Sequence, residues 1–271
     1  MDDHVAGHQQ QQKQKQQIKN KSKNKVLLAK TVQQLKEKYR NNIQFATVSL
    51  DEFIAGSLLE KWYHCTDWRK GPYHVSHLSD GLRFLTLNKY GGYYFDLDVL
   101  MVRPVTYYSN FVASPDDYNV ASNSIHADLN NPVMELALKN FVANYRQVKA
   151  DIWAHNGPAL LLRVLKKWCN TSDVASMNYV RCKGFHVLPR PTFNPVHFSN
   201  WDELFVQQQR STIKETSTTG TPKWLTDQVI GVHTCNKMSN GGLLFKNSTQ
   251  GYIRLARQHC PRIFSIAPET F

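Results

Sequence analysis

Hydrophobic residues recur along the chain with two periods, which predicts helices alternating with short strands. Apolar residues three and four apart, or helix-start signals, predict helices over residues 26–39, 51–62, 76–90 and 251–259, and others from Asn131-Pro132 and Gly157-Pro158. Shorter runs rich in β-branched and aromatic residues predict strands over residues 43–50, 93–95, 99–102, 185–188 and 229–234. This alternation indicates an α/β fold with a mostly parallel or mixed sheet. Such sheets usually begin with a strand, and we identify none before residue 26.

The chain is organised around residues 78–104, where the strongest predicted helix leads into a buried strand. Gly91-Gly92 ends the helix, because glycine adopts the left-handed conformation that a helix stop needs. An aromatic strand over residues 93–95 follows, and Asp96 and Asp98 come directly after it. Two carboxylates at the end of a buried strand suggest a binding site.

Asp96 and Asp98 flank one leucine, and in an extended segment residues two apart point to the same side. Both carboxylates could therefore meet one hard cation such as Mn²⁺ or Mg²⁺, with substrate phosphates and water as further ligands. A D-x-D triplet alone also occurs as a pair of solvated turn residues. The aromatic strand before it and the apolar run after it favour the metal site here.

Three further side chains are candidates for the same site. Asp80 and Arg83 are three apart on the preceding helix and share a face. They form either a surface ion pair or a donor site in which Asp80 binds a base or ribose and Arg83 faces phosphate or orients an aspartate. A histidine in a strand is usually structural, but His233 could supply a third protein ligand to a metal.

The length and the net charge of the chain do not select one class of partner. The 271 residues suffice for one large α/β domain or two smaller ones. The net charge is +12; residues 1–25 hold six Lys against two Asp, which is +4, so +8 belongs to the rest. This charge suits phosphates, nucleic acid or an anionic membrane. Residues 1–25 are low in complexity and predicted to be disordered, and without interleaved aromatics a solvated tail is favoured over nucleic-acid binding.

Cysteines and glycosylation motifs bear on the compartment. Five cysteines leave at least one thiol free in a monomer, and Cys169 and Cys182, which flank a polar loop, are candidates for a local disulfide. N-x-S/T motifs occur at Asn20, Asn170 and Asn247, and the pairing of Asn170 with Cys169 favours a secretory lumen, although such motifs also arise by chance. We find neither a signal peptide nor an apolar run of about 20 residues in this sequence.

The motifs L-S-D-x-x-R and G-G-x-Y-x-D-x-D together resemble the sugar-nucleotide-binding region of the α-1,4-galactosyltransferase and α-1,4-N-acetylhexosaminyltransferase family. The resemblance covers about residues 62–261, and later segments continue it in the same order. These segments are residues 152–158, 162–169, 184–189, 193–201, 231–236 and 258–261.

The resemblance implies a GT-A fold, here lacking its first strand, and a retaining α-1,4 transfer of a sugar from a UDP-sugar to a terminal sugar. The transferred sugar would be galactose or N-acetylgalactosamine, and N-acetylglucosamine is a less favoured candidate. The acceptor would be a glycosphingolipid. It also implies Mn²⁺ or Mg²⁺, a glycolipid or glycan acceptor partner, no nucleic-acid partner, and a membrane protein on the lumenal face of the Golgi apparatus. No side chain is an obvious nucleophile, so front-side transfer and a covalent intermediate both stay open.

Carried over by position, the family's roles fall on six residues. They are Asp96, Asp98 and His233 as metal ligands, Asp80 and Arg83 with the two aspartates as donor-binding residues, and Asn156 as a catalytic residue facing the transferred sugar. The expected domains are a tail over residues 1–25 and a catalytic domain over residues 26–271, with a sugar-binding region at about 62–125 and an α-1,4-glycosyltransferase region at about 131–261.

The sequence also departs from the family pattern. Family members open with an F-x-E-T-S strand that helps to hold the nucleotide base, and this strand is not visible here. Ser122-Asn123 occupies a position near the donor sugar where members tend to have a small residue or glycine. Cys235 stands where members have tryptophan. A catalytically inactive, truncated member that binds a nucleotide or a partner is therefore the alternative.

Overall fold

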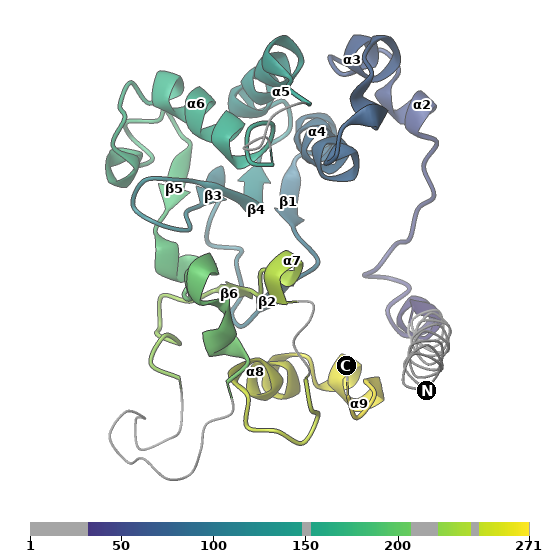
Figure 1. Ribbon diagram of the computed structural model, residues 1–271, viewed down its shortest axis with the longest axis vertical. Helices are drawn as coiled ribbons and strands as arrows, with labels where there is room; N and C mark the ends of the chain where they lie inside the picture. The colour runs from purple at the N-terminus through teal and green to yellow at the C-terminus, as the bar shows by residue number, and fades with distance from the viewer. Residues whose placement is uncertain (1–31, 148–152, 207–221, 240–243, 271) are drawn as a thin grey trace, which may run out of the picture. The chain divides into compact units, whose positions relative to one another are not determined.

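The computed structural model describes residues 32–147, 153–206, 222–239 and 244–270 (Figure 1). It divides into two units, Met1–Ser49 and Leu50–Phe271. In the first unit residues 32–38 are helical, as predicted, whereas the strand predicted over residues 43–50 is wrong. Residues 43–49 form neither helix nor strand, and Ile43, Phe45 and Val48 are between 36% and 51% exposed. The alternating pattern there has no sheet face on which to bury its apolar side.

The helix predicted over residues 51–62 is two short helices. They are α2 (Leu50–Ile54) and α3 (Glu60–Cys65). Gly56 lies between them with a φ of +69°, a left-handed conformation that no helix interior accommodates. The apolar spacing predicts helical structure here correctly, but it does not predict the break at Gly56.

The second unit continues with α4 (His74–Tyr90), α5 (Pro132–Asn144), α6 (Pro158–Trp168), α7 (Asn236–Ser239), α8 (Gly251–His259) and α9 (Pro261–Ile266). Its strands are β1 (Gly92–Phe95), β2 (Val99–Met101), β3 (Phe111–Ala113), β4 (Ala121–Ala127), β5 (His186–Leu188) and β6 (Gly231–His233). Short 3₁₀ helices lie at Trp68–Lys70, Val174–Ser176, Arg190–Thr192 and Phe198–Leu204. The sequence predicted all of these except α7, α9, β3, β4 and the 3₁₀ helices.

The strands form two sheets of mixed character. The larger sheet has the order β1-β4-β3-β5, in which β1, β4 and β3 are antiparallel neighbours and β3 and β5 run parallel. The smaller sheet pairs β2 and β6 antiparallel. The fold is thus mixed α/β, as predicted.

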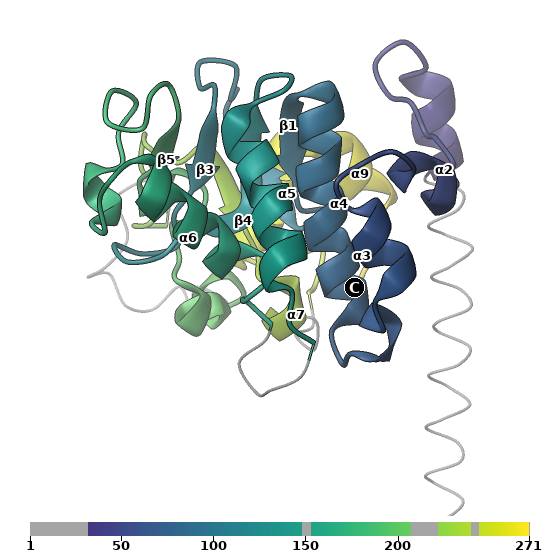
Figure 2. The same cartoon turned by 90° about the horizontal axis from the view of Figure 1, so that it is seen from above.

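Helices α4, α5 and α6 cover one face of the larger sheet (Figures 1 and 2). The main core lies between these layers, where Phe84, Ile125 and Phe141 are completely buried. Phe111 and Phe193 are completely buried in a separate cluster with residues of β2 and β5, and their rings stack 5.8 Å apart. Because both faces of the sheet are packed, its strand ends are fixed in place.

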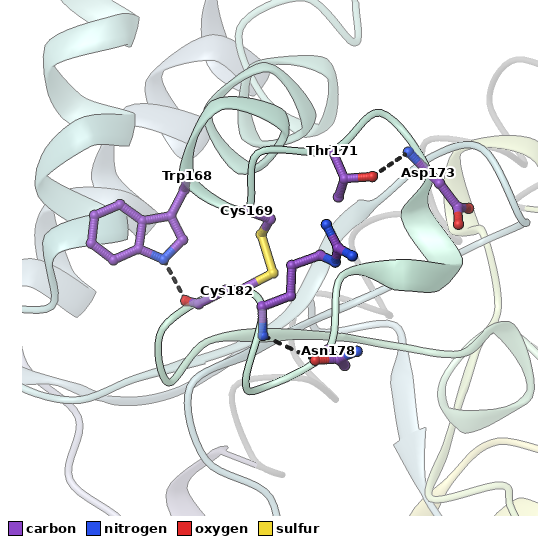
Figure 3. The surroundings of a disulfide bond; sticks show 7 residues. Trp168, Cys169, Thr171, Asp173, Asn178 and Cys182 are labelled. Carbon is purple, nitrogen blue, oxygen red and sulfur yellow. Dashed lines mark hydrogen bonds between the residues drawn. A yellow bond between two sulfur atoms is a disulfide. The ribbon is translucent and has the colours of Figure 1, made fainter.

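The loop after α6 is closed by a disulfide between Cys169 and Cys182, which confirms the predicted pairing (Figure 3). Trp168 supports it by donating a hydrogen bond from Nε1 to the carbonyl oxygen of Cys182, at 2.5 Å. Cys65, Cys235 and Cys260 are free thiols. Within the described residues, no helix combines the length and apolar character needed to cross a membrane.

Candidate metal and donor-binding site

The two aspartates lie where β1 leaves the larger sheet. Gly91 ends α4 with a φ of +65°, and a Cβ there would come within 2.7 Å of the Leu129 nitrogen, so glycine is required on both counts. Strand β1 then pairs with β4 up to Phe95, and the Asp96 nitrogen donates to the carbonyl oxygen of Asn123 at 2.8 Å. The chain turns directly after this bond.

The turn holds both carboxylates beside the start of β2. The Val99 nitrogen donates to the Asp96 carbonyl oxygen at 3.0 Å, which closes the turn. Leu97, between the aspartates, is fully exposed. The chain therefore turns this apolar side chain outward and keeps both carboxylates partly buried.

Pairing of β2 with β6 brings His233 to the aspartates from more than 130 residues away. Val99 lies opposite His233 in the ladder, and the Thr234 nitrogen donates to the Asp98 carbonyl oxygen at 3.0 Å. One ligand atom from each of Asp96, Asp98 and His233 lies within 4.8 Å of the others. The structure thus brings all three predicted metal ligands together.

Asp98 and His233 form an ion pair, with 3.3 Å between Oδ2 and Nε2. Burial opposes both charges, but the hydrogen bond to His233 and that from the Asn236 nitrogen hold the pKa of Asp98 below its usual value. Burial likewise acts to lower the pKa of His233, and the hydrogen bonds to Asp98 and Cys235 outweigh it and raise that pKa to about 10. A metal bound through the His233 imidazole would require that ring to be neutral, so protons and metal would compete for it.

Arg83 connects the aspartate turn to α4. Its Nη1 lies 3.3 Å from Asp96 Oδ1 and also donates to the carbonyl oxygen of Ser122. Its guanidinium lies over the ring of Tyr94, 4.6 Å from the centroid, and the Tyr94 hydroxyl donates to Asp96 Oδ1 at 2.7 Å. Arg83 is only 8% exposed, so these contacts orient Asp96 from a fixed position.

Asp80 lies behind Arg83 and is 5% exposed. Its Oδ1 is 3.2 Å from Arg83 Nη2, so the two residues form a buried ion pair rather than a surface one. Burial raises the pKa of Asp80 to about 7, with Arg83 acting against this and Asp96 adding to it. A Cβ on Gly157 would come within 2.5 Å of the Asp80 carboxylate, so the chain before α6 passes directly against it.

Asn156 has a local bonding pattern that accounts for its burial. It is 1% exposed, its Oδ1 accepts from the Arg146 nitrogen at 3.2 Å, and its Nδ2 donates to the Arg146 carbonyl oxygen at 2.7 Å. The oxygen and the nitrogen of the Asn156 side-chain amide are therefore both bonded to the backbone of Arg146. The predicted contact of Asn156 with the transferred sugar stays a prediction.

Two carboxylates and one imidazole fit a divalent metal. Oxygen ligands suit Mg²⁺ and Mn²⁺, and an imidazole is compatible with Mn²⁺ and other transition metals. The three ligand atoms lie within 4.8 Å of one another, so they can bind one ion. Three protein ligands leave coordination positions on that ion for phosphate oxygens and water. The donor set therefore suits a metal that binds jointly with a diphosphate.

Sequence reasoning missed two groups around this site. Tyr94 precedes Asp96 by two residues, a spacing that places both on one face of a strand and could have signalled their contact. Lys237, on α7, lies between the rings of Tyr73 and Trp153, at 4.9 Å and 4.7 Å from their centroids. Only the fold brings these rings together, because they lie about 80 residues apart.

Comparisons with known proteins agree with the site. The family model described as "Alpha 1,4-glycosyltransferase conserved region" matches residues 126–267, just over half of the chain. The model described as "Glycosyltransferase sugar-binding region containing DXD motif" matches residues 7–120. These matches place the chain in the class of D-x-D-containing glycosyltransferase sequences, and the chain belongs to the alpha 1,4-glycosyltransferase family.

Curated relatives are similar at low identity. Lactosylceramide 4-alpha-galactosyltransferase is 29% identical over 220 residues in Mus musculus and 28% in Rattus norvegicus; the match covers 81% of this chain and 57% of each relative. Alpha-1,4-N-acetylglucosaminyltransferase of Homo sapiens is 26% identical over 232 residues, with 83% of this chain and 62% of that protein covered. The chain thus spans a little over half the length of these relatives. No solved structure gives a significant match.

Proposed function

We propose that this chain is a retaining glycosyltransferase that moves a sugar from a UDP-sugar to a terminal sugar in α-1,4 linkage. The observation that carries the proposal is the convergence of the turn that holds Asp96 and Asp98 with His233 on β6, beside the buried Arg83. Family membership supports the reaction type.

Asp96, Asp98 and His233 would hold a divalent metal, for which we propose Mn²⁺, with Mg²⁺ as the substitute. When bound, the metal stabilises the negative charge that develops on the diphosphate leaving group. Arg83 fixes the orientation of Asp96, and Asp80 fixes Arg83 from behind, as the buried ion pair indicates. We therefore assign Asp80 and Arg83 as donor-site positioning residues.

The choice of donor and acceptor follows from the relatives. Two relatives carry the name lactosylceramide 4-alpha-galactosyltransferase, which favours galactose or N-acetylgalactosamine and a glycosphingolipid acceptor. The third, named for N-acetylglucosamine, keeps that sugar as a further candidate. We place the reaction on the lumenal face of the Golgi membrane, where the Cys169–Cys182 disulfide would persist.

Hydrolysis of UDP-galactose, UDP-N-acetylgalactosamine and UDP-N-acetylglucosamine, with and without Mn²⁺, tests the proposal. Wild type should hydrolyse one of them only with metal, and Asp98→Asn should lose that activity. Glu135→Gln is the matched control, because Glu135 forms a surface ion pair with Lys139 on α5. Loss of activity in this control, or equal activity in Asp98→Asn, would contradict the assignment.

The second candidate is a member that binds UDP and metal without turnover. It is favoured by the position of β1, which is an edge of the described sheet and is preceded by no strand in the described residues. Metal-dependent UDP binding, with neither hydrolysis nor transfer to lactosyl or N-acetylglucosaminyl acceptors, would select this candidate.

A further inference from the structure

The turn after α6 contains a modification motif that the transferase site does not use. Asn170, Thr171 and Ser172 form an N-x-S sequence directly after the helix C-cap at Cys169. Asn170 has a φ of +50°, a left-handed conformation that asparagine tolerates and that commonly ends helices. Helix termination therefore explains an asparagine at this position, but it does not explain the hydroxyl two residues later.

The side chains of this motif are accessible to a modifying enzyme. Asn170 and Ser172 are both exposed, and among the described residues no hydrogen bond or ion pair engages the Asn170 side chain. The intervening Thr171 is held in place, because its Oγ1 accepts from the Asp173 nitrogen at 3.1 Å (Figure 3). The acceptor amide thus projects from an ordered turn into solvent.

The motif at Asn247 differs in this respect. Asn247 Nδ2 donates to Glu269 Oε2 at 3.3 Å, and Thr249, which supplies the hydroxyl, also takes part in an interaction. A substituent on Asn247 would have to break the contact with Glu269. The structure therefore separates these two motifs, which the sequence alone treats alike, and the third motif, at Asn20, lies outside the described residues.

The neighbouring disulfide points to the compartment in which such modification occurs. Cys169 is bonded to Cys182 and directly precedes Asn170. Disulfides form and persist in oxidising compartments such as the endoplasmic reticulum lumen, where N-linked glycans are attached. The turn therefore combines an accessible acceptor with independent structural support for exposure to that environment.

A substituent on Asn170 would leave the donor site open. Gly157, before the first turn of α6, lies against Asp80, whereas Asn170 follows the last turn. Helix α6 has 11 residues, which at 1.5 Å per residue separates the two ends by about 16 Å. Asn170 is exposed at this far end of α6, so a sugar chain there would extend into solvent.

We propose that Asn170 carries an N-linked oligosaccharide. In this reaction a C–N bond forms between Asn170 Nδ2 and the anomeric carbon of a lipid-linked oligosaccharide diphosphate. The bond between that carbon and the diphosphate oxygen breaks, the lipid diphosphate leaves, and the amide gives up one proton. The modification requires entry into the secretory pathway, and it does not require transferase activity.

The test expresses the full chain with a secretory signal in mammalian cells and measures the mobility shift after treatment with peptide N-glycosidase. Asn170→Gly keeps the left-handed position but removes the acceptor, so it should abolish the Asn170 glycan. Ser172→Ala leaves Asn170 in place and should also abolish it, whereas Ser172→Thr should retain it. Mass spectrometry after enzymatic release in ¹⁸O water should show labelled aspartate at position 170.

The result is decisive in either direction. Persistence of the glycan in the double variant Asn20→Gln/Asn247→Gln supports the assignment, and loss of every shift in that double variant overturns it. Unmodified Asn170 in secreted wild type with an intact Cys169–Cys182 bond also overturns it, because folding and compartment are then both in order. Donor hydrolysis, measured separately, reports only on the proposed transferase.

Discussion

At the residue scale, the donor site depends on a chain of contacts that runs from the core to the aspartate turn. Asp80 holds Arg83, and Arg83 together with the Tyr94 hydroxyl holds Asp96. The sequence placed Asp80 and Arg83 on one helix face but left open whether they were a surface pair. Burial decided this, because neither side chain exceeds 8% exposure. Residue chemistry named His233 only as a possible ligand, and the family resemblance assigned it, since its approach depends on pairing between strands far apart in sequence.

Arg83→Lys should lower the donor hydrolysis rate by about 10–100-fold, the usual effect of losing a group that orients a metal ligand. A lysine ammonium cannot contact Asp80, Asp96 and the Ser122 carbonyl in the same planar arrangement. Steady-state kinetics would measure the effect. The control is Arg181→Lys in the exposed disulfide loop, which should match wild type, and unchanged activity in Arg83→Lys would rule out the positioning role.

At the element scale, local chemistry predicted the helix ends well. Gly91 ends α4, and Asn131 caps α5 by accepting from the Val133 nitrogen, with Pro132 in the first turn. Strand β4 escaped prediction because its sequence, ASNSIHA, is rich in polar residues, although nearly all of it is buried. The Asn123 amide nitrogen is paired through the fold, because it donates to Asn194 Oδ1, whereas Asn123 Oδ1 and Ser124 Oγ are buried without a hydrogen-bond partner among the described residues. No local pattern carries that information.

Gly157→Ala should destabilise the protein by about 1–3 kcal/mol, the usual cost of overpacking, because the added Cβ would overlap the Asp80 carboxylate. Urea unfolding would measure the change. Gly251→Ala is the matched control: Gly251 also lies at the start of a helix, and there the nearest atom would be 3.3 Å away. Equal effects at the two positions would show that the contact with Asp80 is not decisive.

Replacing Cys169 and Cys182 together by serine should lower the free energy of unfolding by about 2–5 kcal/mol, because the bond closes a loop of 13 residues in the unfolded chain. Thermal and urea unfolding would report the loss. Cys65→Ser, at an exposed free thiol, should have little effect. If the double variant unfolds like wild type, the loop is held by its other contacts alone.

At the scale of the whole molecule, the sheet contains histidines whose charged forms the fold disfavours. Burial lowers the pKa of His126 on β4 and of His186 on β5. His126 Nδ1 also accepts from the Asn110 nitrogen at 2.8 Å, which requires the neutral ring. A folded-state pKa below the unfolded value of about 6.5 means that the unfolded chain binds more protons. Each such histidine therefore makes the fold less stable as the pH falls below about 6.5.

His126→Gln should therefore have a shallower dependence of stability on pH than wild type between pH 5 and 6.5. The difference is at most about 1.4 kcal/mol per pH unit, the value for one proton. Asp80, with its pKa raised to about 7, contributes the opposite slope in this range but is common to both proteins. Urea unfolding at several pH values would measure the difference, and parallel curves would contradict it.

The central claim is that Asp96, Asp98 and His233 hold one divalent metal that is completed by a nucleoside diphosphate. Electron paramagnetic resonance of Mn²⁺ tests it most directly, because binding removes the free-ion signal. Wild type and Glu135→Gln should bind about one Mn²⁺ and bind it more tightly when UDP is present, while Asp98→Asn should bind it weakly under both conditions. Equal Mn²⁺ binding by wild type and Asp98→Asn, or binding indifferent to UDP, would contradict the account.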